Sequence, residues 1–524
     1  MKFNRTKNAT RNAFYGILLK LYGIIIPFIM RTVFIHFMGE QYLGLSSLFT
    51  SVLQVLNLAE LGVGSAMVYS MYKPIAEDNT KKICALMKMY RTYYRIIGLV
   101  IAVAGLILTP FVPSLIKGDI PGELNIYVLY LLELSVTVLS YWLFAYRNCL
   151  FYAYQRSDIN SKINIISNTV MYLIQLFVLI FVRNYYVYII VSLLATVTKN
   201  IATGLLSIKR FPQYEPQGEL SKSEKKDINK RIRDLFTSKI GSVVIGSADS
   251  IVISAFLGLK VLARYQNYSF IMNSIMGILT ILYASCTAGI GNSLVVETRE
   301  KNFNDLKKIT FIFGWISTFC AVSFLCLYQP FMTLWMGEER LLPYSIVICL
   351  AAYFFIAEIN QLLNLFKDAG GLWSKDKFRP LVTSLANLGM NLAMVRFWGL
   401  YGVILSTVLS MLFIGMPWLF YNLFTELFDK EDLLPLLKEI ISFVFVLTIS
   451  AFATYGLCEL TNADGVIGIL IRMVICVIVP NTILFICFRR TKEYEQALLL
   501  VNKVTKGKLS FLVKDTNVGR KVIN

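Results

Sequence analysis

Long apolar runs separated by short polar breaks form the dominant pattern along this chain. Each run holds roughly 18 to 30 residues, the length that an α-helix needs to cross a hydrocarbon core about 30 Å thick. The breaks carry charges, proline or glycine, as turns between spans do. The runs cover residues 14–37, 43–72, 96–116, 126–151, 163–182, 185–206, 240–257, 265–295, 309–334, 344–366, 381–395, 400–424, 440–460 and 466–488. The pattern therefore predicts an all-α polytopic membrane protein with about 14 transmembrane helices.

Composition and charge agree with a membrane protein. Of 524 residues, 56% are hydrophobic and 16% are charged, and the mean hydropathy is +0.62. With the N-terminus inside and the spans alternating, about 40 Lys and Arg fall in inner loops and about 6 in outer loops. The formal charge of +19 is thus explained by topology, and nucleic acid is not expected as a partner. We expect a multi-pass protein of the cytoplasmic membrane with both termini in the cytoplasm.

The chain also carries a weak internal repeat. Identities at one offset include the pairs Lys20 and Lys239, Phe37 and Phe256, Gly39 and Gly258, and Asn168 and Asn387; at a slightly larger offset, ELGVGSAMVY aligns with TAGIGNSLVV. Repeats of this kind are typical of transporters. They predict two pseudo-symmetric six-helix lobes facing a central cleft, residues 1–206 and 240–424, joined by a basic cytoplasmic loop at 207–239. Two extra transmembrane helices at 425–490 and a cytoplasmic amphipathic tail at 491–524 would follow.

Charged residues inside the predicted spans are candidates for function, because each costs about 2.5 to 3.5 kcal/mol on insertion scales unless it finds a partner or water. Lys20 and Arg31 lie on one face of the first span, about 16 Å apart along the helix axis. Lys20 either reaches the cytoplasmic interface or faces the cleft; for Arg31 a cleft-facing role is favoured. A cationic stripe of this kind suits a pyrophosphate-bearing cargo.

Four carboxylates also fall inside predicted spans. They either pair with the cations or bind a coupling H⁺ or Na⁺. These residues are Glu60, Glu133, Asp249 and Glu358. Arg147 lies near a helix end, where anchoring at the membrane interface is the favoured interpretation.

Nine cysteines show no CxxC or zinc-like spacing and are interpreted as small core residues, so no metal site, disulfide or cofactor is expected. P-loop, GxSxG and HExxH patterns are absent, and no predicted outer loop is long enough for a catalytic domain. The sequence therefore does not favour an enzyme.

Four stretches of sequence resemble the polysaccharide flippases of the multidrug/oligosaccharidyl-lipid/polysaccharide exporter superfamily, especially the O-antigen and capsule branch. They are AELGVGSAMVYSMYKPIAEDNTKKI, SADSIVISAFLG, FKDAGGLWSKDKFRPLVTSLANLGMNL and LYGVILSTVLS. The resemblance implies a two-lobed transporter that alternates between inward and outward faces. It also implies that the cargo is a polyprenyl-diphosphate-linked oligosaccharide used for surface polysaccharide such as lipopolysaccharide or capsule. Related lipid-linked precursor flippases use cleft-facing cations, which agrees with Lys20 and Arg31.

Two alternatives stay open at this point. One is a cation-coupled multidrug exporter of the same superfamily, which the intramembrane carboxylates would also suit. The other is a membrane enzyme such as a polysaccharide polymerase or glycosyltransferase, which the short outer loops disfavour. Expected partners are lipid-linked oligosaccharide, membrane lipids and polysaccharide assembly proteins. The sequence identifies neither the sugar nor the coupling ion.

Overall fold

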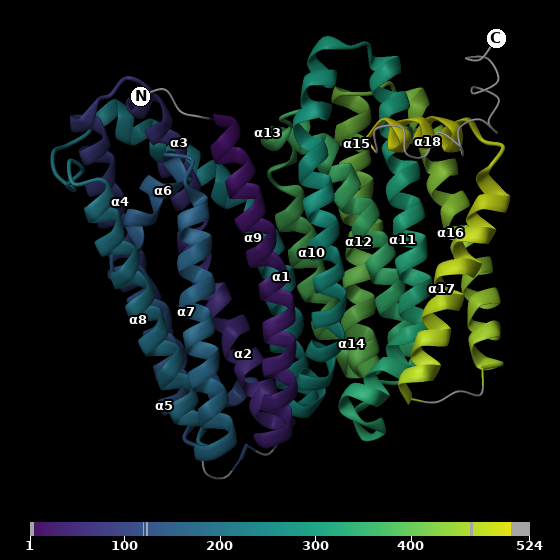
Figure 1. Cartoon of the computed structure of the whole chain (residues 1–524), viewed down its shortest axis with the longest axis horizontal. Coiled ribbons are helices and arrows are strands. Elements are labelled where there is room, and N and C mark those ends of the chain that lie inside the picture. The colour runs from purple at the N-terminus through teal and green to yellow at the C-terminus, as the bar shows by residue number, and fades with distance from the viewer. Residues whose placement is uncertain (1–4, 119, 122–123, 462–464, 505–524) are drawn as a thin grey trace. The chain divides into compact units, whose positions relative to one another are not determined.

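The computed structural model describes residues 5–118, 120–121, 124–461 and 465–504. This part of the chain is built of α-helices joined by short 3₁₀ and π turns and contains no strand (Figure 1). It divides into two compact units, Met1–Gln266 and Asn267–Asn524, called unit 1 and unit 2 below. The predicted all-α fold class is confirmed.

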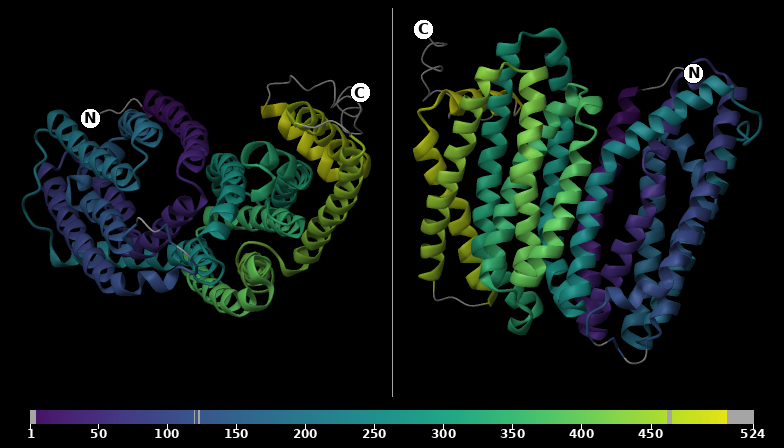
Figure 2. Two further views of the ribbon diagram at one scale, coloured as in Figure 1. Left: turned by 90° about the horizontal axis from the view of Figure 1, so that it is seen from below. Right: turned by 180° about the vertical axis from the view of Figure 1, so that it is seen from behind.

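Unit 1 is a bundle of long helices (Figure 2), two of whose spans are interrupted by short 3₁₀ turns. Its elements are α1 (Arg5–Phe37), α2 (Glu40–Leu56), η1 (Asn57–Glu60), α3 (Val63–Ala76), α4 (Thr80–Leu108), η2 (Thr109–Leu115), α5 (Ile126–Trp142), η3 (Ala145–Arg147), α6 (Asn148–Ala153), α7 (Ser157–Phe177), η4 (Val178–Val182), α8 (Tyr185–Arg210), α9 (Lys222–Leu257) and the first turns of α10 (Leu259–Val296).

Unit 2 holds the rest of α10 and the helices that follow it. They are α11 (Arg299–Met336), η5 (Glu338–Arg340), α12 (Tyr344–Ala369), α13 (Trp373–Asp376), α14 (Arg379–Ser410), η6 (Met411–Gly415), α15 (Met416–Glu426), η7 (Lys430–Asp432), α16 (Leu433–Glu459), α17 (Gly465–Phe488) and α18 (Lys492–Val504).

Each predicted span corresponds to helix in the structure. Among the described residues, 12 helices are long and apolar enough to cross a membrane, or 13 if the bent pair Ile126–Trp142 and Ala145–Ala153 is one span. One of the 12, Trp373–Glu426, has 54 residues and would be about 80 Å long if straight, more than twice the hydrocarbon thickness. Its backbone turns at Gly399, where φ is 54° and ψ is −134°. Counting it as two spans gives the predicted number of about 14.

The backbone supports the internal repeat at its best-aligned glycines. Gly39, between α1 and α2, has φ 94° and ψ 174°, and Gly258, between α9 and α10, has φ 93° and ψ 172°. A side chain would strain both positions, because L residues rarely adopt positive φ. The two glycines therefore make the same turn at equivalent places in the repeat.

About two thirds of the predicted basic loop at 207–239 is helical in the structure, because α8 runs to Arg210 and α9 begins at Lys222. Ser221 caps α9, its hydroxyl accepting from the Glu224 backbone N–H while the Glu224 carboxylate accepts from the Ser221 N–H. These reciprocal bonds start the helix before the apolar span begins. By packing, α9 belongs with the helices of unit 1. The lobe boundaries inferred from the repeat remain a prediction.

The predicted amphipathic tail begins as α18, which lies across the ends of the long helices of unit 2 (Figure 1). Glu493 pairs with Lys307 of α11, and the Tyr494 ring packs against Phe311 and Trp315. Partial burial would raise the pKa of the Glu493 carboxyl, but the Lys307 ammonium holds that pKa below its usual range. The rest of the predicted tail, 505–524, lies outside the described residues.

Candidate functional site

The second predicted span of unit 1 is discontinuous. After α2 ends at Leu56, one 3₁₀ turn carries Asn57 and Glu60, and Gly62 adopts a left-handed conformation with φ 88° before α3 begins. Gly62 packs against α9, where a Cβ added to it would lie 2.7 Å from the Leu235 Cβ. Broken helices in transporters often mark the substrate or ion site, because the break frees backbone and side-chain polar groups inside the membrane.

A chain of hydroxyl groups fixes the carboxylate at this break. Tyr90 donates to the Tyr94 hydroxyl at 2.6 Å, and Tyr94 donates to Glu60 Oε1 at 3.1 Å. Tyr141 of α5 donates to Asn57 Oδ1 at 3.2 Å, and its ring meets Tyr94 edge to face. The α2–α3 break is thus joined by hydrogen bonds to both α4 and α5.

A second break follows in the same unit, between α5 and α6. Phe144 has φ 54°, and the two helices are bent by 46°. The turn η3 places Arg147 inside the protein, where it is 6% exposed, with its guanidinium 5.7 Å from the centre of the Tyr146 ring. Neither Nε nor Nη1 of Arg147 has a hydrogen-bond partner within the described ranges. The predicted interfacial anchoring of Arg147 is therefore wrong: the left-handed turn at Phe144 directs this residue inward.

The two predicted cations of α1 differ in their surroundings. Lys20 is exposed and makes no ion pair or hydrogen bond with the part of the chain that the structure describes. Beside it, Gly16 and Gly23 leave the helix surface open, since a Cβ on either would meet no described atom within 4 Å. Arg31 is partly buried and donates from Nη1 to the Gln266 carbonyl oxygen at 2.8 Å.

The predicted carboxylate Glu133 lies on α5. It interacts electrostatically with the hydroxyls of Tyr185 and Tyr188, and Tyr188 also interacts with Arg31. The structure therefore gathers Glu133 and Arg31 around one tyrosine of α8. This polar group is separate from the Glu60 cluster but belongs to the same unit.

The two remaining predicted carboxylates are more deeply buried. Asp249 is a buried residue of α9. Glu358, on α12 of unit 2, is 2% exposed, and its Oε2 atom has no hydrogen-bond partner among residues that the structure places. Tyr283 donates from its hydroxyl to the Glu358 backbone oxygen at 3.1 Å. An ionised carboxylate in such a place is costly, so Glu358 needs a proton or a cation.

Unit 2 also contains polar and thiol clusters that the sequence analysis did not identify. Asn387 of α14 donates to the Thr407 hydroxyl at 2.9 Å, and the Asn391 amide donates to the Asn387 Oδ1 at 3.4 Å. Cys326, Cys458 and Cys476, from α11, α16 and α17, have sulfur atoms within 4.8 Å of one another in an apolar cluster. Only the three-dimensional packing brings together residues this far apart in sequence.

Comparison with known proteins identifies the family. A family model described as "Polysaccharide biosynthesis protein" matches residues 9–286, which is more than half of the chain. The chain belongs to this family. The match spans both broken helices of unit 1 and includes Lys20, Arg31 and Glu60. The resemblance predicted from the sequence is confirmed. A comparison with curated protein sequences finds no match.

Solved structures show the same fold at low sequence identity. The lipid II flippase MurJ in an inward closed conformation is 16% identical with a TM-score of 0.68, over 91% of this chain and 99% of that chain. An inward-facing multidrug resistance MATE family transporter of the MOP superfamily is 15% identical with a TM-score of 0.57, over 77% and 97%. A MOP superfamily transporter from Pyrococcus furiosus is 14% identical with a TM-score of 0.52, over 79% and 94%. The chain is therefore a multi-pass membrane protein with the fold of these transporters.

Proposed function

We propose that this protein is a flippase that moves polyprenyl-diphosphate-linked oligosaccharide from the inner to the outer leaflet of the cytoplasmic membrane. The product would serve surface polysaccharide biosynthesis. Support comes from the polysaccharide biosynthesis family and from a fold similar to that of the lipid II flippase MurJ. Transport would proceed by alternating access, with both termini on the cytoplasmic side, as the distribution of Lys and Arg favours.

The observation that carries this proposal is Lys20 on the open face of α1, which has no ion pair or hydrogen bond with any described residue. A lysine within a span needs an anion or water to offset its cost. Since the described residues supply no anion to Lys20, a passing diphosphate can do so. Arg31 lies on the same helix face, nearer the predicted outer end. It would meet the phosphates later in the transport cycle.

Removing both charges tests the proposal. We expect Lys20→Ala with Arg31→Ala to lower the outer-leaflet exposure of lipid-linked sugar at least about tenfold, because charge-assisted contacts to phosphate are lost. The assay would use the full chain in proteoliposomes, with an added glycosidase or lectin reporting the flipped sugar. Lys209→Ala is a matched control, because Lys209 is an exposed lysine at the end of α8.

Interpretation of the double variant requires the two single variants and a measurement of folding. Arg31→Ala also removes the bond to the Gln266 carbonyl, so its thermal unfolding must be measured. Lys20→Ala removes no hydrogen bond or ion pair with a described residue and should leave stability unchanged. Wild-type transport by a well-folded double variant would contradict the proposed role of the two cations.

A second candidate function is a cation-coupled multidrug exporter, favoured by the buried Glu358 and the likeness to MATE family transporters. In either case, H⁺ or Na⁺ bound at a buried carboxylate could couple transport to an ion gradient. Drug efflux that depends on Glu358 and persists without lipid-linked sugar would favour this alternative. Expected partners are the lipid-linked cargo, membrane lipids and polysaccharide assembly proteins.

A further inference from the structure

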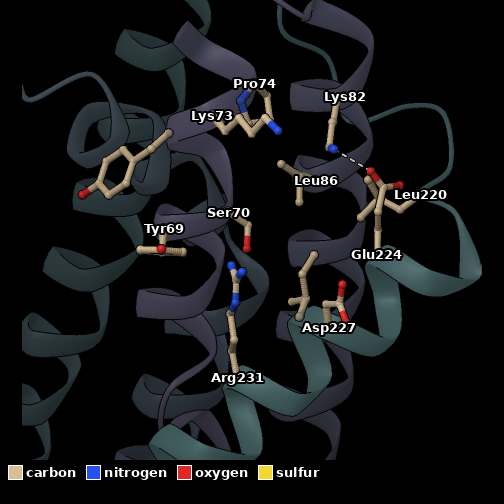
Figure 3. Close-up of a pocket in the computed structure, with 12 residues that line it drawn as sticks. Tyr69, Ser70, Lys73, Pro74, Lys82, Leu86, Leu220, Glu224, Asp227 and Arg231 are labelled. Carbon is tan, nitrogen blue, oxygen red and sulfur yellow. Dashed lines mark ion pairs between the residues drawn. The ribbon is translucent and has the colours of Figure 1, made fainter. Parts of the chain in front are cut away.

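A pocket of about 420 Å³ opens at one end of unit 1, between α3, α4 and α9. Its inner wall is apolar and comes from the buried residues Leu86, Leu220 and Ile228. Polar and aromatic side chains line the rest, and Figure 3 shows the Arg231 guanidinium extending from α9 toward Ser70 of α3. The volume lies within the range of small-molecule sites. In the predicted orientation, the pocket lies at the cytoplasmic ends of the spans.

Polar contacts between α4 and α9, one of them between two lining residues, hold the walls of this pocket together. Lys82 of α4 pairs with Glu224 of α9 at 2.5 Å, the contact drawn as a dashed line in Figure 3. One turn further along α9, Asn229 Oδ1 accepts a hydrogen bond from the Tyr93 hydroxyl at 2.6 Å. Two polar links to α4 therefore hold the first turns of α9 in place. The pocket is preformed, which lowers the entropic cost of binding.

Two cations remain available in this pocket for an anionic ligand. Arg231 lies over the Tyr69 ring at 4.7 Å and forms no ion pair with a described residue. The Lys73 side chain is 82% exposed, and its only ion pair among the described residues is a 3.8 Å contact with Glu77, the residue that follows α3. Such an exposed pair contributes little, so Lys73 can exchange it for a phosphate. A guanidinium and an ammonium together suit a phosphate, because the first binds it bidentately and the second adds a point charge.

The remaining side chains of the lining suit a hydroxylated group next to a phosphate. Asp227 and Ser70 supply acceptors for hydroxyl donors. Tyr69 and Tyr72 are exposed aromatic residues, 60% and 48% respectively, and tyrosine is enriched where helices leave the membrane. Their rings offer flat apolar surfaces at headgroup level.

We infer that this pocket binds the headgroup of a lipid in the cytoplasmic leaflet that combines phosphate with sugar or glycerol hydroxyls. Arg231 and Lys73 contact the phosphate, while Asp227 and Ser70 accept from the hydroxyls. The pocket is distinct from the α1 cations and lies within the segment of the chain that the family model matches. The idea that this pocket collects cargo before transport rests on the proposed function. The inference that the pocket binds a lipid headgroup does not depend on that function.

Lipid binding to the full-length protein tests this inference. The protein is placed in phosphatidylcholine nanodiscs, and native mass spectrometry measures the retention of two added probes, undecaprenyl diphosphate and phosphatidylglycerol. We expect Arg231→Gln to weaken binding of at least one probe about tenfold, equal to about 1.4 kcal/mol. Lys73→Gln should weaken it less, since its ammonium is more exposed. Lys226→Gln is the control, because this exposed lysine of α9 does not line the pocket.

The two probes separate the sources of the headgroup. If the variants lose only the binding of undecaprenyl diphosphate, the site is one for cargo lipid. If they lose the binding of both probes, the site is one for anionic lipid in general. Unchanged retention of both by well-folded Arg231→Gln and Lys73→Gln would overturn the inference. Because binding is measured without transport, it is independent of the Lys20 and Arg31 assay.

Discussion

The second span of unit 1 and its counterpart in the repeat have different backbones despite aligned sequences. ELGVGSAMVY begins inside the break between α2 and α3, where Gly62 has φ 88°, whereas TAGIGNSLVV is the end of the continuous 38-residue helix α10. Gly62 aligns with Gly289 and Gly64 with Gly291, so the glycine pair alone does not break a helix. The break must depend on what surrounds it.

Packing and side-chain chemistry explain the difference. Gly62 lies against α9, and a Cβ added to it would be 3.0 Å from the Ile232 carbonyl oxygen. Only a residue without a side chain therefore fits between the break and α9. The aligned Gly289 meets no described atom within 4 Å. Glu60 accepts from Tyr94 at the break, whereas the aligned Thr287 bonds back to the Tyr283 carbonyl within its own helix. The comparison shows that unit 1 has a polar break at a position where the aligned segment of α10 continues as a helix.

The largest expected effect comes from adding one methyl group at the two aligned glycines. Gly62→Ala places an L residue at φ 88° and its Cβ 2.7 Å from the Leu235 Cβ. We expect this strain to lower the free energy of unfolding by about 1–3 kcal/mol and to lower the amount of folded protein. Gly289→Ala should be neutral or stabilise α10 by up to about 1 kcal/mol, because alanine favours a helix. Thermal unfolding in detergent and membrane yield measure both variants. Equal effects at both positions would mean that the break is not held by packing on α9.

The next largest effect is expected at the aligned polar residues. Glu60→Ala leaves the Tyr94 hydroxyl without its acceptor in a low-dielectric site, which should cost about 1–3 kcal/mol in the free energy of unfolding. Thr287→Ala removes only a 3.3 Å hydroxyl contact within the helix and should stay within about 0.5 kcal/mol. Glu60→Gln keeps an acceptor oxygen, so recovery of stability by Gln would assign the loss to the hydrogen bond. If Glu60→Ala and Thr287→Ala unfold alike, the Tyr94 bond does not stabilise the break.

The sequence predicts the spans well because hydrophobic length is a local property. It could not predict the breaks, because Phe144 and Gly62 adopt left-handed conformations through contacts with residues far along the chain, such as Leu235.

The proposed cations Lys20 and Arg31 could be found from their cost in the membrane, and their transport role remains a prediction. Arg147 was misplaced because its burial depends on the α5–α6 turn. The hydroxyl chain from Tyr90 to Glu60 joins two spans, and no sequence spacing indicates it.

The smallest expected effect concerns the link between the two broken helices of unit 1. Tyr141→Phe removes the hydroxyl that donates to Asn57 Oδ1 at 3.2 Å but keeps the ring that packs edge to face on Tyr94. We expect a loss of about 0.5–1.5 kcal/mol in the free energy of unfolding, the usual net value of one hydrogen bond. Tyr127→Phe is the matched control, since Tyr127 is an exposed tyrosine of the same helix whose hydroxyl has no hydrogen-bond partner among the described residues. If Tyr141→Phe changes the free energy of unfolding no more than Tyr127→Phe does, the α2–α3 break keeps its conformation without the bond to α5. The contacts with α4 and α9 would then hold the break.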